Sequence, residues 1–162
     1  MITPDAVYGI LGTVMDPEIP VISVVDLGIV RQVTVNGAQV AITITPTYSG
    51  CPAMREMQRD MSVALGEHGI NDVAFSTVFA PAWTTDWISA EAREKLREFG
   101  IAPPGPAERD GLITLARARA AVPCPYCGAS DTQLKSEFGS TACKAIHVCN
   151  SCKQPFDEFK AL

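Results

Sequence analysis

Two Cys-x-x-Cys pairs near the carboxyl end constrain the fold of this chain more than any other feature. Two residues lie inside each of the pairs Cys124–Cys127 and Cys149–Cys152, and twenty-one residues separate the pairs. Each pair can form a tight turn that directs two sulfur atoms at one ion, and a hairpin can bring two such turns together. The spacing therefore predicts a four-sulfur metal site in a small β ribbon over residues 123–162.

The size of this segment indicates that the metal is structural. A unit of about forty residues rarely buries enough apolar surface to fold alone, whereas structural zinc contributes an apparent ~10 to 16 kcal/mol. We expect zinc, with iron as an alternative that accepts the same thiolates. Four buried cysteines without metal are a further alternative. Cys143 is interpreted either as a small buried side chain or as a group for metal transfer, and His147 as an ordinary strand residue.

The distribution of charge argues against nucleic acid as a partner. The formal net charge is -5, and residues 1–90 hold three basic and nine acidic residues, so no basic surface is expected there. No stretch approaches the roughly 18 apolar residues of a membrane span. The first residues also lack the pattern of a secretory signal. We expect a cytoplasmic protein that binds neither nucleic acid nor membrane.

The residues before the ribbon show the pattern of an α+β domain. Spacing and capping signals predict helices over 4–15, from 51 and from 89, and alternation predicts strands over 29–35, 39–45 and 73–79. This order gives helices packed on a small mixed β-sheet, followed by the β ribbon. The proline-rich segment 101–111 cannot sustain a helix. The predicted domains are thus 1–102 and 123–162, with 103–122 as linker and connecting segment.

Regularly spaced apolar side chains predict the core of the first domain. The methionines on the second helix are interpreted as core filler. The predicted core includes Val40, Ile42, Ile44, Met54, Met57, Met61, Ala92, Leu96 and Phe99. Trp83 and Trp87 have two interpretations: an exposed pair that anchors a partner protein, or core packing of the last helix against the sheet.

Cys51 is the one cysteine far from the ribbon. It lies between a predicted strand and a predicted helix, and Pro52 at the first helical position would make Cys51 the N-cap. The helix dipole and unpaired amides would then favour the thiolate and lower its pKa from about 8.5 towards 7 or below. Cys51 is accordingly a candidate reactive, metal-binding sulfur. The alternative is a small residue that simply fits the turn.

Acidic and hydroxyl side chains are candidates to join Cys51 in a mixed metal site. They are Asp16, Glu18, Asp26 and Thr45. Thiolate and carboxylate together suit a transition metal with room for ligand exchange, although each acid alone is also typical of turn and cap chemistry. A hydrolytic Cys-His or Ser-His-Asp centre is excluded. The only histidine of the first domain lies at the far end of the predicted helix, roughly 25 Å from Cys51.

Five segments carry a resemblance to known families. They are DPEIPVISVVDLGIV, ITPTYSGCP, PAWTTDWISAEAREKLREFGIAPPGPA, CPYCG and FGSTACKAIHVCNSCKQPFDEFK. Together they resemble the PaaD family of phenylacetate-degradation proteins, also called PaaJ, over nearly the whole chain. The first hundred residues resemble the wider family of small iron-sulfur assembly domains that includes SufT and the eukaryotic cytosolic iron-sulfur targeting factor.

The PaaD resemblance implies a non-catalytic accessory component of the multicomponent oxygenase that epoxidises the ring of phenylacetyl-CoA. Its implied partners are the di-iron component and the iron-sulfur reductase, whose metal centres it would help to install or maintain. The family's reactive cysteine corresponds to Cys51, its acidic motif to Asp16 and Glu18, and its DLG acid to Asp26. Iron or an iron-sulfur cluster is the implied transient cargo at Cys51. The oligomeric state stays open, with a homodimer as one alternative.

Two other functions compete with this maturation role. One is a non-catalytic binding subunit that holds the oxygenase complex together, with the tryptophans as contacts. The other is a thiol-disulfide enzyme, which the doubled Cys-x-x-Cys pairs at zinc spacing disfavour, because a redox pair normally stands alone.

Overall fold

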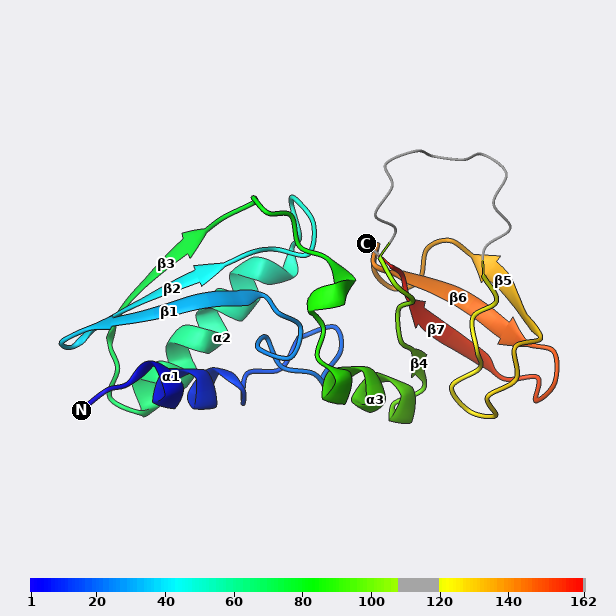
Figure 1. The fold of residues 1–162 in the computed structure, drawn as a ribbon, viewed down its shortest axis with the longest axis horizontal. Coiled ribbons are helices and arrows are strands. Elements are labelled where there is room, and N and C mark those ends of the chain that lie inside the picture. The colour runs from blue at the N-terminus through cyan, green and yellow to red at the C-terminus, as the bar shows by residue number, and fades with distance from the viewer. Residues whose placement is uncertain (108–119, 162) are drawn as a thin grey trace. The chain divides into compact units, whose positions relative to one another are not determined.

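The computed structural model describes residues 1–107 and 120–161 as two compact units. The first unit is Met1–Ala92 and the second begins at Arg93 (Figure 1). Helices packed with small sheets confirm the predicted α+β class. The middle of the predicted linker, 108–119, lies outside the described residues.

Helix α1 (Pro4–Leu11) begins as predicted but ends early. Thr3 Oγ1 accepts the Ala6 N–H at 3.2 Å and caps the helix. The predicted end at residue 15 is wrong, because the N–H groups of residues 13 and 14 bond only three residues back and tighten the chain into a turn. Met15 then forms an isolated β-bridge with Ser23, which draws the chain away from helical geometry.

The first unit contains the predicted small mixed sheet. Strands β1 (Val30–Asn36) and β2 (Gln39–Ile44) form an antiparallel hairpin, and Gly37 supplies the positive φ of +64° at its turn. Strand β3 (Asp72–Thr77) runs parallel to β2, giving the order β1-β2-β3. A parallel neighbour requires a crossover, which helix α2 (Ala53–Glu67) supplies between β2 and β3.

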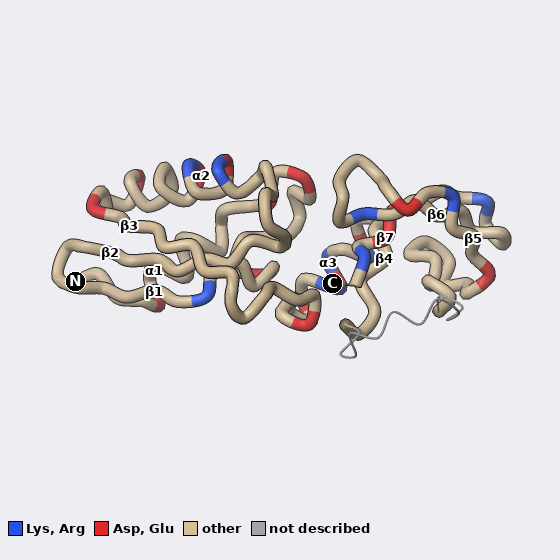
Figure 2. Tube along the Cα trace, turned by 90° about the horizontal axis from the view of Figure 1, so that it is seen from above, with Lys and Arg blue, Asp and Glu red and all other residues tan. Residues whose placement is uncertain are grey.

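Helix α2 lies along the sheet as a separate layer (Figures 1 and 2). Met57, Met61 and Leu65 are at most 2% exposed, as are the predicted core residues of β2. The methionines are therefore core residues, as the spacing predicted, although Met54 is only half-buried. Helix α1 packs against both α2 and β1 and completes the core of this unit.

Residues 83–89, here called the tryptophan strap, hold the loop Asp26-Leu27-Gly28. The strap contains the 3-10 helix η1 (Thr85–Trp87). Trp83 Nε1 donates to the Leu27 carbonyl at 2.9 Å, and the backbone N–H at position 89 donates to the Asp26 carbonyl at 3.2 Å. Trp87 packs so closely on Gly28 that a Cβ there would lie 2.8 Å from the Cβ of the tryptophan. The strap thus fixes each of three consecutive loop residues.

Helix α3 (Ala90–Glu98) begins at the predicted cap. Ser89 Oγ accepts the Ala92 N–H at 3.1 Å, and Gly100 ends the region with a φ of +90°. Leu96 is buried as predicted, but the expectation that Phe99 is buried is wrong, since 52% of it is exposed. Phe99 follows the last helical residue, so the helical spacing used to predict its burial no longer applies there.

The second unit is built on a four-stranded sheet of order β4-β7-β6-β5. Its strands are β4 (Ile101–Ala102), β5 (Thr132–Ser136), β6 (Lys144–Cys149) and β7 (Pro155–Phe159). Strands β5, β6 and β7 form the antiparallel ribbon, and the short β4 adds in parallel to β7. Residues 101–102 were assigned to the first domain, but they pair with the ribbon sheet. The predicted domain boundaries stay predictions.

No helix within residues 1–107 or 120–161 is long and apolar enough to span a membrane.

Candidate metal centre and the Cys51 loop

The four cysteines of the two pairs come together in the second unit. Their sulfur atoms all lie within 4.8 Å of one another. Cys124 and Cys152 are 3.7 Å apart at sulfur, and Cys127 and Cys149 are 3.6 Å apart. These separations far exceed the roughly 2.05 Å of a disulfide. The four residues are free thiols gathered around one point.

The two Cys-x-x-Cys turns have the same backbone structure. In the first, the N–H of Gly128 donates to the Cys124 carbonyl at 2.9 Å. In the second, the N–H of Lys153 donates to the Cys149 carbonyl at 3.0 Å. Gly128 and Lys153 both have positive φ, at 74° and 64°. Sequence reasoning noted the glycine but missed that Lys153 occupies the equivalent position, a match that alignment of the two pairs would have revealed.

This arrangement fits a tetrahedral four-thiolate metal ion. Bonds of about 2.3 Å to zinc place tetrahedral sulfurs about 3.8 Å apart, close to the two shortest separations observed. Cys124 and Cys149 are buried with Ala102 and Phe156, so the cluster also serves as part of the ribbon's apolar core. Cys127 lies on the exposed side. All four protein ligands are present, and the set therefore suits a closed structural site.

The protein environment prepares one sulfur as a thiolate. The Cys152 backbone N–H donates to the Cys149 sulfur at 3.5 Å and is the main cause that lowers the pKa of Cys149 to about 6. The pKa of Cys152 rises to about 12: the Gln154 backbone N–H favours its thiolate, but burial and the neighbouring sulfurs outweigh that bond. A metal ion needs all four thiolates, so its binding is expected to weaken as pH falls.

The other two candidate residues of the ribbon lie outside the sulfur cluster. His147 Nε2 is 2.7 Å from Glu158 Oε2, and its ring stacks on Phe156 with centroids 5.4 Å apart. Cys143 is partly buried, and its sulfur lies 3.0 Å from Thr141 Oγ1. Neither side chain belongs to the group of four ligands.

Cys51 lies one residue further from the helix than predicted. Helix α2 begins at Ala53 with Pro52 at the N-cap, so Cys51 precedes the cap. Its backbone is held in a turn, with its N–H on the Tyr48 carbonyl at 3.2 Å and its carbonyl accepting the Met54 N–H at 3.3 Å. The side chain is half-exposed and lines an open depression of about 530 Å³. Cys51 is accessible, and the depression also contains Arg55.

The acidic candidates serve as turn and loop caps. Asp16 is 7% exposed, and its Oδ1 accepts the N–H groups of Glu18 and Ile19 at 2.7 and 2.8 Å. Asp26 and Ser23 cap each other: Asp26 Oδ2 accepts the Ser23 N–H at 3.1 Å and Ser23 Oγ accepts the Asp26 N–H at 3.0 Å. Glu18 is exposed. These bonds explain the two aspartates as structural elements of the loop before β1.

The predicted mixed site around Cys51 is not assembled. Across the described ranges 1–107 and 120–161, the ribbon cluster is the only group of three or more His, Cys, Asp or Glu side chains with converging ligand atoms. Thr45 is different from the acids. It is 2% exposed, and its Oγ1 is buried without a hydrogen-bond partner. A buried hydroxyl without a partner is unfavourable, and it needs an explanation beyond the fold.

The tryptophans are part of the strap. The expectation of an exposed pair is wrong for Trp83, which is 5% exposed and uses its indole N–H inside the unit. Trp87 is half-buried, with the Arg31 guanidinium 3.6 Å from its ring centroid. The second interpretation of Trp83, core packing, is therefore correct.

Comparisons with known families agree with these two modules. Residues 4–74 match the model described as iron-sulfur cluster assembly protein, and residues 108–160 match the PaaD zinc beta ribbon domain. Among solved structures, a DUF59 domain of unknown function from Bacillus anthracis matches with a TM-score of 0.54 and 29% identity, covering 57% of this chain and 90% of that one. A conserved hypothetical protein from Thermotoga maritima matches with a TM-score of 0.50 and 31% identity, covering 59% and 94%.

Curated relatives extend the match to the whole chain. The PaaD-type component assigned to 1,2-phenylacetyl-CoA epoxidase in Escherichia coli (strain K12) is 46% identical over 156 residues, covering 96% of this chain and 92% of that one. An Fe-S protein maturation auxiliary factor from Porphyromonas gingivalis is 37% identical over 97 residues, covering 58% and 90%. SufT from Staphylococcus aureus is 34% identical over 82 residues, covering 49% and 92%.

The fold and the cysteines thus define a two-module protein in which an iron-sulfur assembly domain precedes a zinc beta ribbon. The chain belongs to the PaaD family of phenylacetyl-CoA epoxidase components.

Proposed function

We propose that this protein is an accessory maturation factor for a multicomponent phenylacetyl-CoA epoxidase. The observation that carries the proposal is an accessible cysteine within a domain of the iron-sulfur assembly family. Cys51 binds iron or an iron-sulfur fragment as cargo and passes it to a subunit of the epoxidase. The resemblance of the whole chain to an assigned epoxidase component supports this client.

The ribbon holds a resident zinc ion through Cys124, Cys127, Cys149 and Cys152. Sulfur separations of 3.6 and 3.7 Å support a four-coordinate ion. Such an ion stabilises the fold and supplies no open position for chemistry. With these four thiols engaged, Cys51 and Cys143 are the two left for cargo, and Cys143 already contacts Thr141 Oγ1.

The surroundings of Cys51 suit an anionic cargo. Iron-sulfur clusters bind through thiolates, and their net charge influences their stability. Arg55 lines the same depression one helical turn along the chain and places positive charge there. The loop that leads from β2 to Cys51 begins at Thr45, whose buried Oγ1 has no protein partner. We assign this hydroxyl to cargo binding.

The protein itself is not an enzyme in this proposal. Its clients are the di-iron component, the iron-sulfur reductase or both. Asp16 and Asp26 act by shaping the loop before β1, because their carboxylates accept backbone N–H groups there. Glu18 is exposed and is available to a client. No proton transfer is assigned to these residues.

Replacing Cys51 with serine is expected to remove iron binding while leaving the fold and the ribbon's zinc intact. The substitution removes one half-exposed sulfur outside the ribbon cluster. Elemental analysis and ultraviolet-visible spectra of anaerobically purified protein would count zinc and iron separately. Cys143→Ser is the matched control, because it removes another partly buried thiol. Equal iron content in wild type and Cys51→Ser would contradict the role of Cys51.

Replacing Thr45 with valine separates stability from function. The change removes a buried hydroxyl that lacks a partner, so the free energy of unfolding is expected to stay constant or rise by about 1 kcal/mol. Iron binding is expected to fall in the same variant. Denaturant titration and iron analysis on one preparation would measure both. A clear loss of stability would show that the hydroxyl belongs to the fold and not to cargo binding.

A non-catalytic binding subunit is the second candidate function. It is favoured by Phe99, Tyr126 and Phe138, large apolar side chains of the second unit that are each more than half exposed. Stable co-purification with the epoxidase subunits, unaffected by Cys51→Ser, would support this function over maturation.

A further inference from the structure

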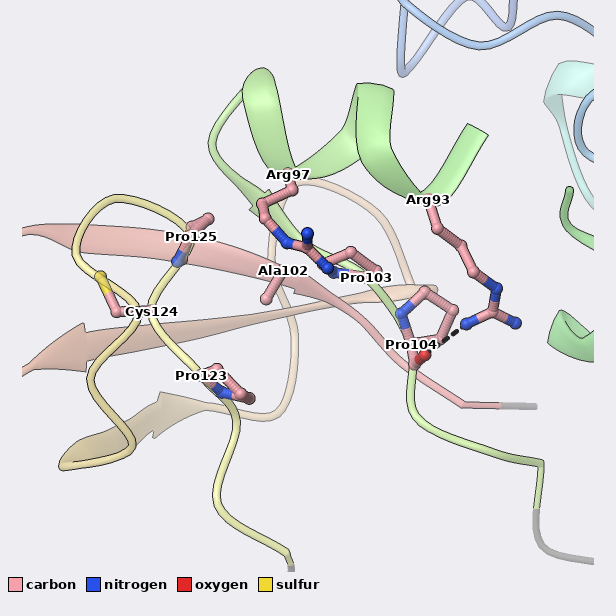
Figure 3. Close-up of a pocket in the computed structure, with 9 residues that line it drawn as sticks. Arg93, Arg97, Ala102, Pro103, Pro104, Pro123, Cys124 and Pro125 are labelled. Carbon is pink, nitrogen blue, oxygen red and sulfur yellow. Dashed lines mark hydrogen bonds between the residues drawn. The ribbon is translucent and has the colours of Figure 1, made fainter. Parts of the chain in front are cut away.

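A pocket of about 480 Å³ lies in the second unit beside the first Cys-x-x-Cys turn (Figure 3). This volume falls within the range of small binding sites. One wall comes from α3, another from the segment after β4, and the third from the cysteine turn. The lining residues are Arg93, Arg97, Ala102, Pro103, Pro104, Pro123, Cys124, Pro125 and Gly128.

The polar part of this pocket is cationic. Arg93 and Arg97 lie one turn apart on α3, and both side chains extend towards the proline-rich segment (Figure 3). Arg93 donates to the Pro104 carbonyl at 2.6 Å, a bond that orients the guanidinium and brings no negative charge to it. Arginine presents a planar fork of donors that matches carboxylates.

The ion pair of Arg97 is readily exchanged. Its NH1 lies 2.6 Å from Glu94 Oε2, and the two side chains are 54% and 55% exposed. Exposed pairs of this kind contribute about 0 to 1 kcal/mol. A carboxylate from a partner can therefore replace Glu94 at little energetic cost.

Exposed aromatic side chains lie next to the pocket. Tyr126 is 57% exposed and lies between two pocket residues in the chain, and Phe99 is 52% exposed just after α3. Tyr126 is fixed against Gly100, where a Cβ would lie 2.5 Å from its hydroxyl oxygen. Arginine and aromatic residues are enriched at the energetically important centres of protein interfaces.

We propose that this pocket binds an acidic, partly apolar segment of a partner protein. Carboxylates of the segment pair with Arg93 and Arg97, and its apolar side chains lie on the prolines and Tyr126. The identity of the partner as a component of the epoxidase rests on the proposed function, whereas the chemistry of the pocket does not. Nucleic acid is disfavoured because the ribbon segment 123–162 holds four lysines and four acidic residues, without a basic excess.

The test uses two fluorescent eight-residue probes, one alternating glutamate with leucine and one alternating glutamine with leucine. Anisotropy at low ionic strength measures their binding to the full zinc-loaded chain. Wild type is expected to bind the glutamate probe and not the glutamine probe. The double variant Arg93→Gln/Arg97→Gln is expected to weaken binding at least about tenfold. Binding of both probes with equal affinity would overturn the proposal.

Single variants provide the matched comparison. Arg97→Gln removes an exposed helical arginine that pairs with a glutamate three residues earlier, and Arg59→Gln does the same on α2. Only Arg97→Gln should weaken the glutamate probe, and both variants should fold because both side chains are exposed. Equal weakening by Arg59→Gln would indicate general charge attraction and overturn the proposal. Full displacement by equimolar inorganic phosphate would also overturn it, in favour of a simple anion site.

The outcome is independent of cargo binding. Neither probe contains metal, so failure of the pocket leaves the iron measurements on Cys51 unchanged. Conversely, loss of the role of Cys51 would leave probe binding to Arg93 and Arg97 unchanged.

Discussion

Replacing Cys149 with serine is expected to unfold the ribbon and release its metal. Cys149 is fully buried, and its sulfur lies 3.6 Å from that of Cys127 and accepts the Cys152 N–H. Because a structural zinc site contributes an apparent ~10 to 16 kcal/mol to folding, its loss exceeds what a small apolar cluster can replace. Zinc analysis and the dispersion of amide resonances from the ribbon would measure the effect.

Cys143→Ser is the control for this prediction within the same unit. Cys143 lies outside the four-sulfur group, and serine can keep a hydrogen bond to Thr141 Oγ1. Its zinc content and ribbon resonances should match those of wild type. A folded ribbon without metal in Cys149→Ser would contradict the structural role of the ion. It would favour the alternative of four buried cysteines.

Replacing Trp83 with alanine is expected to destabilise the first unit by about 3 to 5 kcal/mol. The indole is 5% exposed, and its N–H is bonded to the Leu27 carbonyl. The substitution leaves a cavity and a carbonyl without its partner in the loop that precedes β1. Denaturant unfolding followed by signals of the first unit would measure the change.

Two further variants separate the contributions of the strap. Trp83→Phe keeps most of the ring and loses the hydrogen bond, so a smaller loss of about 1 to 3 kcal/mol is expected. Trp87→Ala should also cost less than Trp83→Ala, because Trp87 is only half-buried. A Trp83→Ala protein of unchanged stability that fails to bind the epoxidase would instead support an exposed interface anchor.

The sequence predicted the fold well wherever local signals agreed with the tertiary structure. The hairpin at Asn36-Gly37 and the caps at Thr3 and Ser89 each form as predicted. The end of α1 was missed because tertiary contacts decide it: Met15 pairs with Ser23 in a bridge that periodicity cannot reveal. Strand β4 was missed because its two residues are too short to give a pattern.

The candidate site was predictable only in part. The cysteine spacing alone predicts the convergence of four sulfurs, because each pair is a local turn and the hairpin joins them. The burial of Trp83 depends on a carbonyl 56 residues earlier in the chain, and no local pattern contains that information. The pocket at Arg93 likewise depends on segments from α3 to the cysteine turn. The acids looked like ligands in the sequence, but the structure places Asp16 and Asp26 on backbone amides.

Iron occupancy of the epoxidase in cells tests the central claim most directly. Cells that lack this protein would receive wild type, Cys51→Ser or Cys143→Ser at equal levels, and iron in the purified epoxidase subunits would be measured. The account predicts that wild type and Cys143→Ser restore occupancy, whereas Cys51→Ser leaves it near the level of cells without the protein. Full restoration by Cys51→Ser would contradict the account.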